Sequence, residues 1–207
     1  MEIIRAREDA VAYEMKPLSC NPSKLKGLSE ELIISHYENN YGGAVRRLNA
    51  ITAQLESLDF ATAPVFMING LKREELIATN SMILHELYFA SLGSEGKPAG
   101  DLHDALVRSF GNLDRWQTQF VAMGKALGGG SGWVLLHYSY RDRKLVNQWA
   151  ADHTYCLAGG SPILAMDMYE HSYHMDYGAN AAAYVDAFMQ NINWENVTRF
   201  YNEHTRT

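Results

Sequence analysis

The stretch Asp167-Met-Tyr-Glu-His-Ser-Tyr-His-Met-Asp-Tyr177 decides the fold, and it follows directly on the apolar run at residues 162–166. A short apolar run bounded by polar residues is typical of a buried strand. Asp167 is therefore expected at the end of a strand, and His171, four residues later, on a short helix. Two such side chains can converge on one point from rigid elements. An Asp-x-x-x-His pair is not specific by itself, because an aromatic-rich turn with incidental polar groups has the same pattern.

Two further histidines, His36 and His85, lie upstream in segments with helical periodicity, the second in a helix expected from about residue 72 to 92. A buried neutral imidazole needs a hydrogen-bond partner or a metal. A single one is more often a hydrogen-bonded core residue than a ligand. Together with Asp167 and His171, however, these residues supply three imidazoles and one carboxylate. That set suits a transition metal such as Fe or Mn and leaves a coordination position open.

The pattern around these residues predicts an α+β protein in two parts. Helical periodicity runs from residue 29 to 58, with the glycines at 42–43 expected to bend or interrupt it, and the next helix returns antiparallel to it. The segment 93–100 (GSEGKPAG) is rich in glycine and charge and reads as a linker. We therefore expect an N-terminal helical hairpin domain over residues 1–95 and a C-terminal α/β domain over residues 96–207.

The C-terminal part is expected to hold a small sheet between helices. Short apolar or alternating runs predict three strands, at residues 133–140, 144–151 and 162–166. A charged turn between the first two runs favours an antiparallel three-stranded sheet. Helices are expected around it at residues 101–110, 113–127, 184–190 and 194–201.

Composition excludes several classes of protein. Of the 207 residues, 47% are apolar and 11% aromatic, which excludes a disordered or fibrous chain. The net charge of −6 and the absence of a basic run argue against a nucleic-acid partner. Cys20 and Cys156 lack the spacing of a thiolate metal site, and we find neither a secretion signal nor an apolar span long enough for a membrane. We expect a cytoplasmic protein without membrane contact.

The stretch at 167–177 resembles the motif Asp-x-Trp-Glu-His-Ala-Tyr-Tyr-x-Asp-Tyr of the iron/manganese superoxide dismutase family. Residues 130–133 (Gly-Ser-Gly-Trp) and 188–194 (Phe-Met-Gln-Asn-Ile-Asn-Trp) are similar to two further motifs of that family. The resemblance runs from about Lys24 to the end of the chain.

The resemblance implies that His36, His85, Asp167 and His171 hold one Fe or Mn ion per subunit, between the two domains. The implied reaction is the disproportionation of superoxide to oxygen and hydrogen peroxide in a ping-pong redox cycle. Fe and Mn share these ligands, so the sequence does not distinguish them.

A homodimer or a dimer of dimers is also implied. In it Glu170 reaches His171 of the partner subunit, and His174 lies at the same interface. The other catalytic residues that the resemblance implies are Asn40, Tyr41 and Tyr173.

The hydrogen bond to metal-bound solvent is expected from a different residue than in many relatives. The Gln that iron members place on the second helix falls at Ser81, which is too short to reach the solvent. Ala151-Asp-His153 looks like members of the family that use a His from this loop. His153 is therefore the expected donor, with a solvated loop histidine as the alternative.

The substrate funnel departs further from the family pattern. A His four residues and a Tyr eight residues after the first ligand are usual, and here Asn40 and Ala44 stand there, with Asn39 in place of a nearby Lys. Two functions stay open: a superoxide dismutase with a remodelled funnel, and a metal-binding homologue with little or no dismutase activity that serves sensing, storage or interaction. The intact ligand set favours the enzyme. The cations that could replace the lost charge are Arg46, Arg47 and Lys72.

Overall fold

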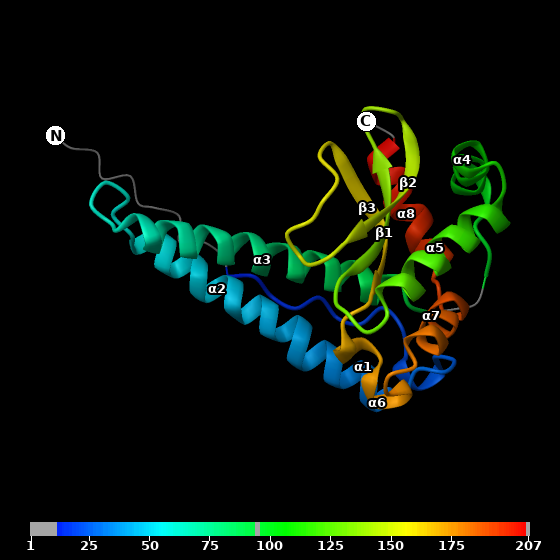
Figure 1. The fold of residues 1–207 in the computed structure, drawn as a ribbon, viewed down its shortest axis with the longest axis horizontal. Coiled ribbons are helices and arrows are strands. Elements are labelled where there is room, and N and C mark those ends of the chain that lie inside the picture. Colours follow the sequence, from blue (N-terminus) through cyan, green and yellow to red (C-terminus); the bar gives the residue numbers. More distant parts are fainter. Residues whose placement is uncertain (1–11, 94–95, 206–207) are drawn as a thin grey trace.

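A hairpin of two long helices forms the N-terminal part of the chain. The computed structural model describes residues 12–93 and 96–205. In it α2 (Gly42–Ser57) and α3 (Val65–Ala90) lie side by side in opposite directions (Figure 1). The expected antiparallel hairpin is confirmed.

The expected start of the second helix near residue 72 is wrong, because α3 already begins at Val65. Pro64 occupies the N-cap position, just outside the helix, where no intrahelical N–H is required of it. Phe66 and Met67 in the first turn are exposed although they are apolar. This turn therefore lacks the amphipathic pattern from which a helix is recognised.

The interruption of the first helix lies earlier than expected. After α1 (Glu30–Ser35) the backbone widens into a π-helical segment, η2 (His36–Tyr41), whereas the glycines at 42–43 open α2 as ordinary helical residues. Short π-helical segments inside α-helices are frequent at functional sites. This one begins at His36, the first of the predicted ligands.

The C-terminal part is built on a three-stranded antiparallel sheet, as expected, and the strands lie in the order β2-β1-β3. Trp133 of β1 pairs with the last residues of both neighbours, Ala150 and Asp167, so these three residues share one end of the sheet. The third strand is longer than predicted and ends at Asp167 itself. The strands are β1 (Trp133–Ser139), β2 (Lys144–Ala150) and β3 (Gly160–Asp167).

Helices surround the sheet and attach it to the hairpin (Figure 1). α3 and α8 pack against β3, α5 packs against β1, and α4 packs against β2. None of the helices in the described part of the chain is both long and apolar enough to cross a membrane. The bounds are α4 (Gly100–Phe110), α5 (Leu113–Leu127), α7 (Ala181–Gln190) and α8 (Trp194–Thr205), with short turns at η1 (Pro22–Lys24), η3 (Glu170–Ser172) and α6 (His174–Tyr177).

The predicted boundary between the two domains, after residue 95, falls at residues 94–95, which lie outside the described part of the chain. The division into residues 1–95 and 96–207 therefore stays a prediction.

Gly132, directly before β1, comes too close to the backbone of β2 to carry a side chain. Its φ is 131°, and a Cβ there would lie 2.1 Å from the carbonyl oxygen of Ala150. Because the pairing of Trp133 with Ala150 holds both backbones in place, Gly132→Ala should lower the free energy of unfolding in urea by about 3 kcal/mol. Gly70→Ala is the matched control, since nothing lies within 4 Å of a Cβ at this exposed helical position. It should raise stability by up to about 1 kcal/mol. Equal effects of the two changes would contradict this account.

Candidate metal centre

Four side chains from separate elements meet between the hairpin and the sheet. His36 opens η2, His85 lies on α3, Asp167 ends β3 and His171 belongs to η3. One donor atom of each lies within 4.8 Å of the other three. The Nε2 atoms of His36, His85 and His171 lie 3.2, 3.5 and 3.1 Å from Oδ2 of Asp167. The convergence predicted from the sequence is confirmed.

Asp167 is a fully buried carboxylate, with no exposed surface. Burial raises the pKa of its carboxyl group, but electrostatic attraction to the imidazoles of His171 and His36 and hydrogen bonds with them outweigh burial and hold this pKa well below the ordinary value. Asp167 is therefore an anion in the folded protein. A buried anion is stable only beside positive charge and hydrogen-bond donors.

Two of the imidazoles that face Asp167, those of His36 and His85, have a lowered pKa, which favours the neutral form with a free lone pair. Burial lowers the pKa of His36, and burial together with the close approach of the His36 imidazole lowers the pKa of His85 to about 3. Nδ1 of His85 donates a hydrogen bond to the carbonyl oxygen of Ser81 at 2.7 Å. The proton is then on Nδ1, and the lone pair of Nε2 points to the cluster.

The donor set fits a metal ion. Nε2 of His85 is buried without a hydrogen-bond partner among the described residues, which costs free energy unless a cation fills the place. Three imidazole nitrogens and one carboxylate oxygen suit Fe or Mn and leave a position open for substrate.

Hydrogen bonds from the 167–177 stretch and from α7 fix the orientation of Asp167. The hydroxyls of Ser172 and Tyr184 donate to its carbonyl oxygen at 2.9 and 2.7 Å, and the backbone N–H of Tyr169 donates to Oδ1 at 2.9 Å. Oδ2 is left to face the three imidazoles. Partners of this kind keep a metal ligand in one rotamer.

The end of the same stretch is tied to the start of the first helix. Asp176 accepts hydrogen bonds from the backbone N–H and the hydroxyl of Ser29, at 2.7 and 2.6 Å. Ser29 also caps α1, since its side chain accepts a hydrogen bond from the backbone N–H of Leu32. The hydroxyl of Tyr177 donates to the carbonyl oxygen of Gly27. These bonds fix α1, and with it His36, relative to the C-terminal half of the site.

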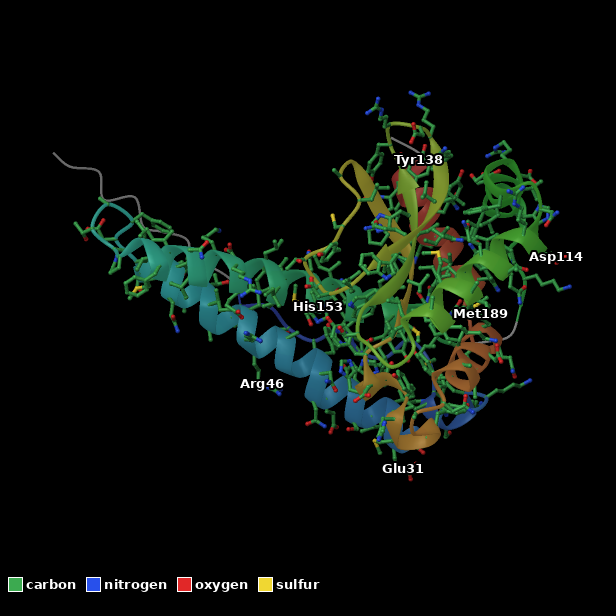
Figure 2. The ribbon with its side chains drawn as sticks, in the orientation of Figure 1. Glu31, Arg46, Asp114, Tyr138, His153 and Met189 are labelled. Carbon is green, nitrogen blue, oxygen red and sulfur yellow. The ribbon has the colours of Figure 1, made fainter. Side chains whose placement is uncertain are left out.

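His153 lies beside the cluster, where the loop after β2 meets α3 (Figure 2). Its Nδ1 accepts a hydrogen bond from the indole N–H of Trp133 at 3.0 Å. Its ring lies 6.1 Å from that of His85 and stacks at 4.9 Å on Tyr169, which in turn stacks at 5.4 Å on His171. Burial lowers the pKa of His153, so the ring is neutral and its proton is on Nε2.

Ser81, which stands where iron members of the family have a Gln, stays beside the ligand ring. Its hydroxyl oxygen lies 3.4 Å from Nδ1 of His85.

Tyr41 and Tyr173, both predicted as catalytic, are buried. The hydroxyl of Tyr41 accepts a hydrogen bond from the backbone N–H of Lys16 at 2.8 Å and donates to Glu86 at 3.2 Å, and its ring stacks on His85 at 6.4 Å. The ring of Tyr173 stacks on Tyr184 at 5.4 Å. The two tyrosines therefore pack around the cluster, and a direct catalytic part for either stays a prediction.

Three predicted residues lie on the surface of the single chain. Glu170 and His174 are exposed and Asn40 is partly exposed. The side chain of His171 is itself 27% exposed. The bridge between subunits that the resemblance implies stays a prediction.

Two of the cations considered for substrate steering are neutralised by neighbours. Arg47 forms an ion pair with Glu74 across the hairpin, and Lys72 forms one with Glu75. Arg46 is exposed on α2 (Figure 2).

Sequence analysis missed two residues that support the site. Asn80 on α3 donates a hydrogen bond to the carbonyl oxygen of His153 at 2.5 Å, and Tyr184 on α7 holds Asp167. Neither stands in a local pattern, because each acts on a residue far away along the chain. The only signal in the sequence that could have found them is a polar residue on a helix face that is expected to pack against other elements.

Comparison with known proteins agrees with this geometry. Residues 98–200 match the family model described as iron/manganese superoxide dismutases, C-terminal domain. A chain with this fold and this donor set, and with the relatives below, belongs to the iron/manganese superoxide dismutase family.

Similar proteins include enzymes named for each metal. The superoxide dismutase (Fe) of Cupriavidus metallidurans is 74% identical over 189 residues, which cover 91% of this chain and 96% of the relative. The superoxide dismutase (Fe) of Aquifex pyrophilus is 34% identical over 190 residues, 88% of each chain. The superoxide dismutase (Mn) 1 of Halobacterium salinarum is 30% identical over 199 residues, 92% of this chain and 96% of the relative.

Replacing His85 should remove the metal. His85→Ala deletes one donor atom and the geometry it imposes, so we expect metal affinity to fall by at least about 100-fold. His137→Ala is the matched control, because both histidines are only 1% exposed but His137 lies on β1 outside the cluster. Metal content by plasma mass spectrometry reads both out. Loss of metal from His137→Ala with retention in His85→Ala would contradict the assignment.

His137 should make the protein sensitive to acid. Burial lowers its pKa to about 4 from an ordinary 6.5, and its ring nitrogens have no hydrogen-bond partner among the described residues. As the pH falls from about 6.5 to 4, His137 binds a proton in the unfolded chain, whereas its buried ring in the folded protein does not. The free energy of unfolding should therefore drop by about 2–3 kcal/mol through this residue, with no further loss below about pH 4.

His137→Leu removes the titrating group. Urea unfolding at pH 7 and pH 4.5 should show a smaller loss of stability in this variant than in the wild type. The same loss in both proteins would contradict the prediction.

Proposed function

We propose that the protein is a superoxide dismutase, which converts superoxide to oxygen and hydrogen peroxide at one metal ion held by His36, His85, Asp167 and His171. The observation that carries the proposal is the convergence of three imidazole nitrogens on a buried, ionised carboxylate. The 74% identity to a superoxide dismutase over most of both chains supports the same reaction. When bound, the ion supplies one-electron oxidation and reduction of superoxide.

We propose iron as the metal, one ion per subunit. The relative with 74% identity is named for iron. The four donor atoms lie within 4.8 Å of one another, which leaves room for a single ion between them.

Asp167 and the histidines contribute in different ways to binding a cation. Asp167 contributes one negative charge, which favours a trivalent ion, and the imidazoles contribute lone pairs without adding negative charge. The hydrogen bond from Nδ1 of His85 to the carbonyl of Ser81 fixes the tautomer and the ring plane.

His153 is the proposed donor to solvent at the open position. Peroxide formation consumes protons, and a neutral N–H beside the cluster can hydrogen-bond the solvent that carries one. Because Nδ1 accepts from Trp133, the proton of His153 is on Nε2 and is available for donation. Its ring is near His85 and half-buried, which shields this donor from bulk water.

The proposed assembly is a homodimer, alone or paired with a second dimer. Glu170 would reach His171 of the partner subunit, with His174 beside it. Exposure of Glu170 and His174, and of part of the His171 ring, supports this arrangement. A reducing cytoplasm is the proposed location, supported by the free thiols of Cys20 and Cys156.

A metal-binding homologue without turnover is the second candidate. Asn40 and the buried Ala44 stand where the family usually places a His and a Tyr of the funnel. Such a site would keep the metal but lack part of its proton supply.

Reconstitution with Fe and with Mn separates the two candidates. Iron-loaded protein should consume superoxide catalytically, and manganese-loaded protein should do so more slowly, because the residues around the ligands set the potential for one metal. Metal content and superoxide consumption are measured on the same samples. Fully loaded protein without catalysis in either form would support the homologue without turnover.

His153→Ala should impair catalysis without removing the metal. Loss of the hydrogen bond to the solvent should lower activity by about 10- to 100-fold, and the reduction potential of the metal should shift because a hydrogen bond near it is lost. His103→Ala, at a partly exposed position on α4, is the control. Unchanged activity and potential in His153→Ala would assign this residue to the solvated loop instead.

A further inference from the structure

We propose that Asn80 is a positioning residue that fixes the loop carrying His153 against α3. The inference rests on the proposed function, because it concerns how His153, the proposed hydrogen-bond donor to the solvent, is held. It assigns no contact between Asn80 and the metal or the substrate.

The tether is a single hydrogen bond between distant parts of the chain. Nδ2 of Asn80 donates to the backbone carbonyl oxygen of His153 at 2.5 Å, across 73 positions of sequence. Asn80 lies on the same helix as the ligand His85, a little more than one turn away. One rigid helix therefore carries a metal ligand and the anchor of the loop, so the distance between His85 and the backbone of His153 is set by that helix.

The other contacts of His153 hold its ring but not the position of the loop relative to α3. Trp133 donates to Nδ1 from β1, and Tyr169 stacks on one face with an interplanar angle of 12°. Both come from the C-terminal half. From the hairpin, the ring of His85 lies 6.1 Å from the His153 ring, and Asn80 adds a hydrogen bond to the backbone of the loop.

Hydrogen bonds within the loop hold the residues on either side of His153 together. Asp152 accepts hydrogen bonds from the backbone N–H and the hydroxyl of Thr154, at 2.7 and 2.6 Å, in a local turn directly around His153. Beyond the turn, Tyr155 and Cys156 are exposed. A displacement of the backbone at His153 would therefore carry the imidazole with it.

Ser81, the residue next to Asn80 on α3, is too short to reach the solvent position of the site itself. The side chain of Ser81 ends beside Nδ1 of His85, at 3.4 Å. It does not extend across the cluster. We therefore expect α3 to affect the solvent position of the site through Asn80, which holds the loop that carries His153.

Two variants of Asn80 test the tether, with a control on the same helix. Asn80→Ala removes the donor, and Asn80→Asp keeps the size of the side chain but places a carboxylate oxygen against the carbonyl oxygen of His153. Thr79→Ala is the control, since Thr79 is the adjacent residue and is also half-exposed. All proteins are studied loaded with iron, and metal content is recorded.

The first measurement is hydrogen exchange by mass spectrometry on the peptide that covers residues 151–157. Both Asn80 variants should exchange about tenfold faster than the wild type there, as expected when one hydrogen bond that closes a loop is lost. Thr79→Ala should not. This measurement does not depend on catalysis.

The second measurement separates positioning of His153 from a general structural effect. The reduction potential of the metal in Asn80→Asp should shift in the same direction as in His153→Ala. The double variant should lose no more activity than His153→Ala alone, because Asn80 acts only through His153.

Unchanged exchange of the loop in both Asn80 variants, an unshifted potential, or additive losses in the double variant would overturn the proposal. Failure of the proposed function is a separate result: loaded wild-type protein would then consume no superoxide. The exchange and potential measurements would still report on the tether.

Discussion

The buried negative charge of Asp167 is the constraint on which the rest of the structure depends. An ionised carboxylate without solvent is costly unless positive charge and donors surround it, and here three imidazoles face one of its oxygens while a backbone N–H bonds the other. The neutral state of His85 leaves the compensation incomplete within the protein. A cation at this point completes it, which is why the donor set and its burial argue for a metal and not for an ordinary polar core.

Placing that charge requires both halves of the chain. Asp167 lies at the end of β3 in the sheet, and His36 and His85 lie on the helices of the N-terminal half. Outside the site, the two halves are joined by hydrogen bonds from Ser29, at the start of the first helix, to Asp176. The geometry of the site is therefore a property of the packing between the halves, and any change that loosens this packing acts on the metal as well.

Much of this was predictable from the sequence, for identifiable reasons. The strand that ends at Asp167, the helices and the four convergent side chains all carry local patterns or resemble a specific motif. The start of α3 does not, because its first turn exposes apolar residues such as Phe66, and the π-helical segment at His36 replaces a bend that two glycines suggested. The tether at Asn80 depends on a partner 73 positions away, and no periodicity reports such a contact.

The most direct test of the account is an anomalous difference map at the iron edge, from crystals of the iron-reconstituted protein. The account predicts one strong peak per chain, bonded to Nε2 of His36, His85 and His171 and to Oδ2 of Asp167. A peak at any other position, or an empty cluster in protein that still consumes superoxide, would contradict it.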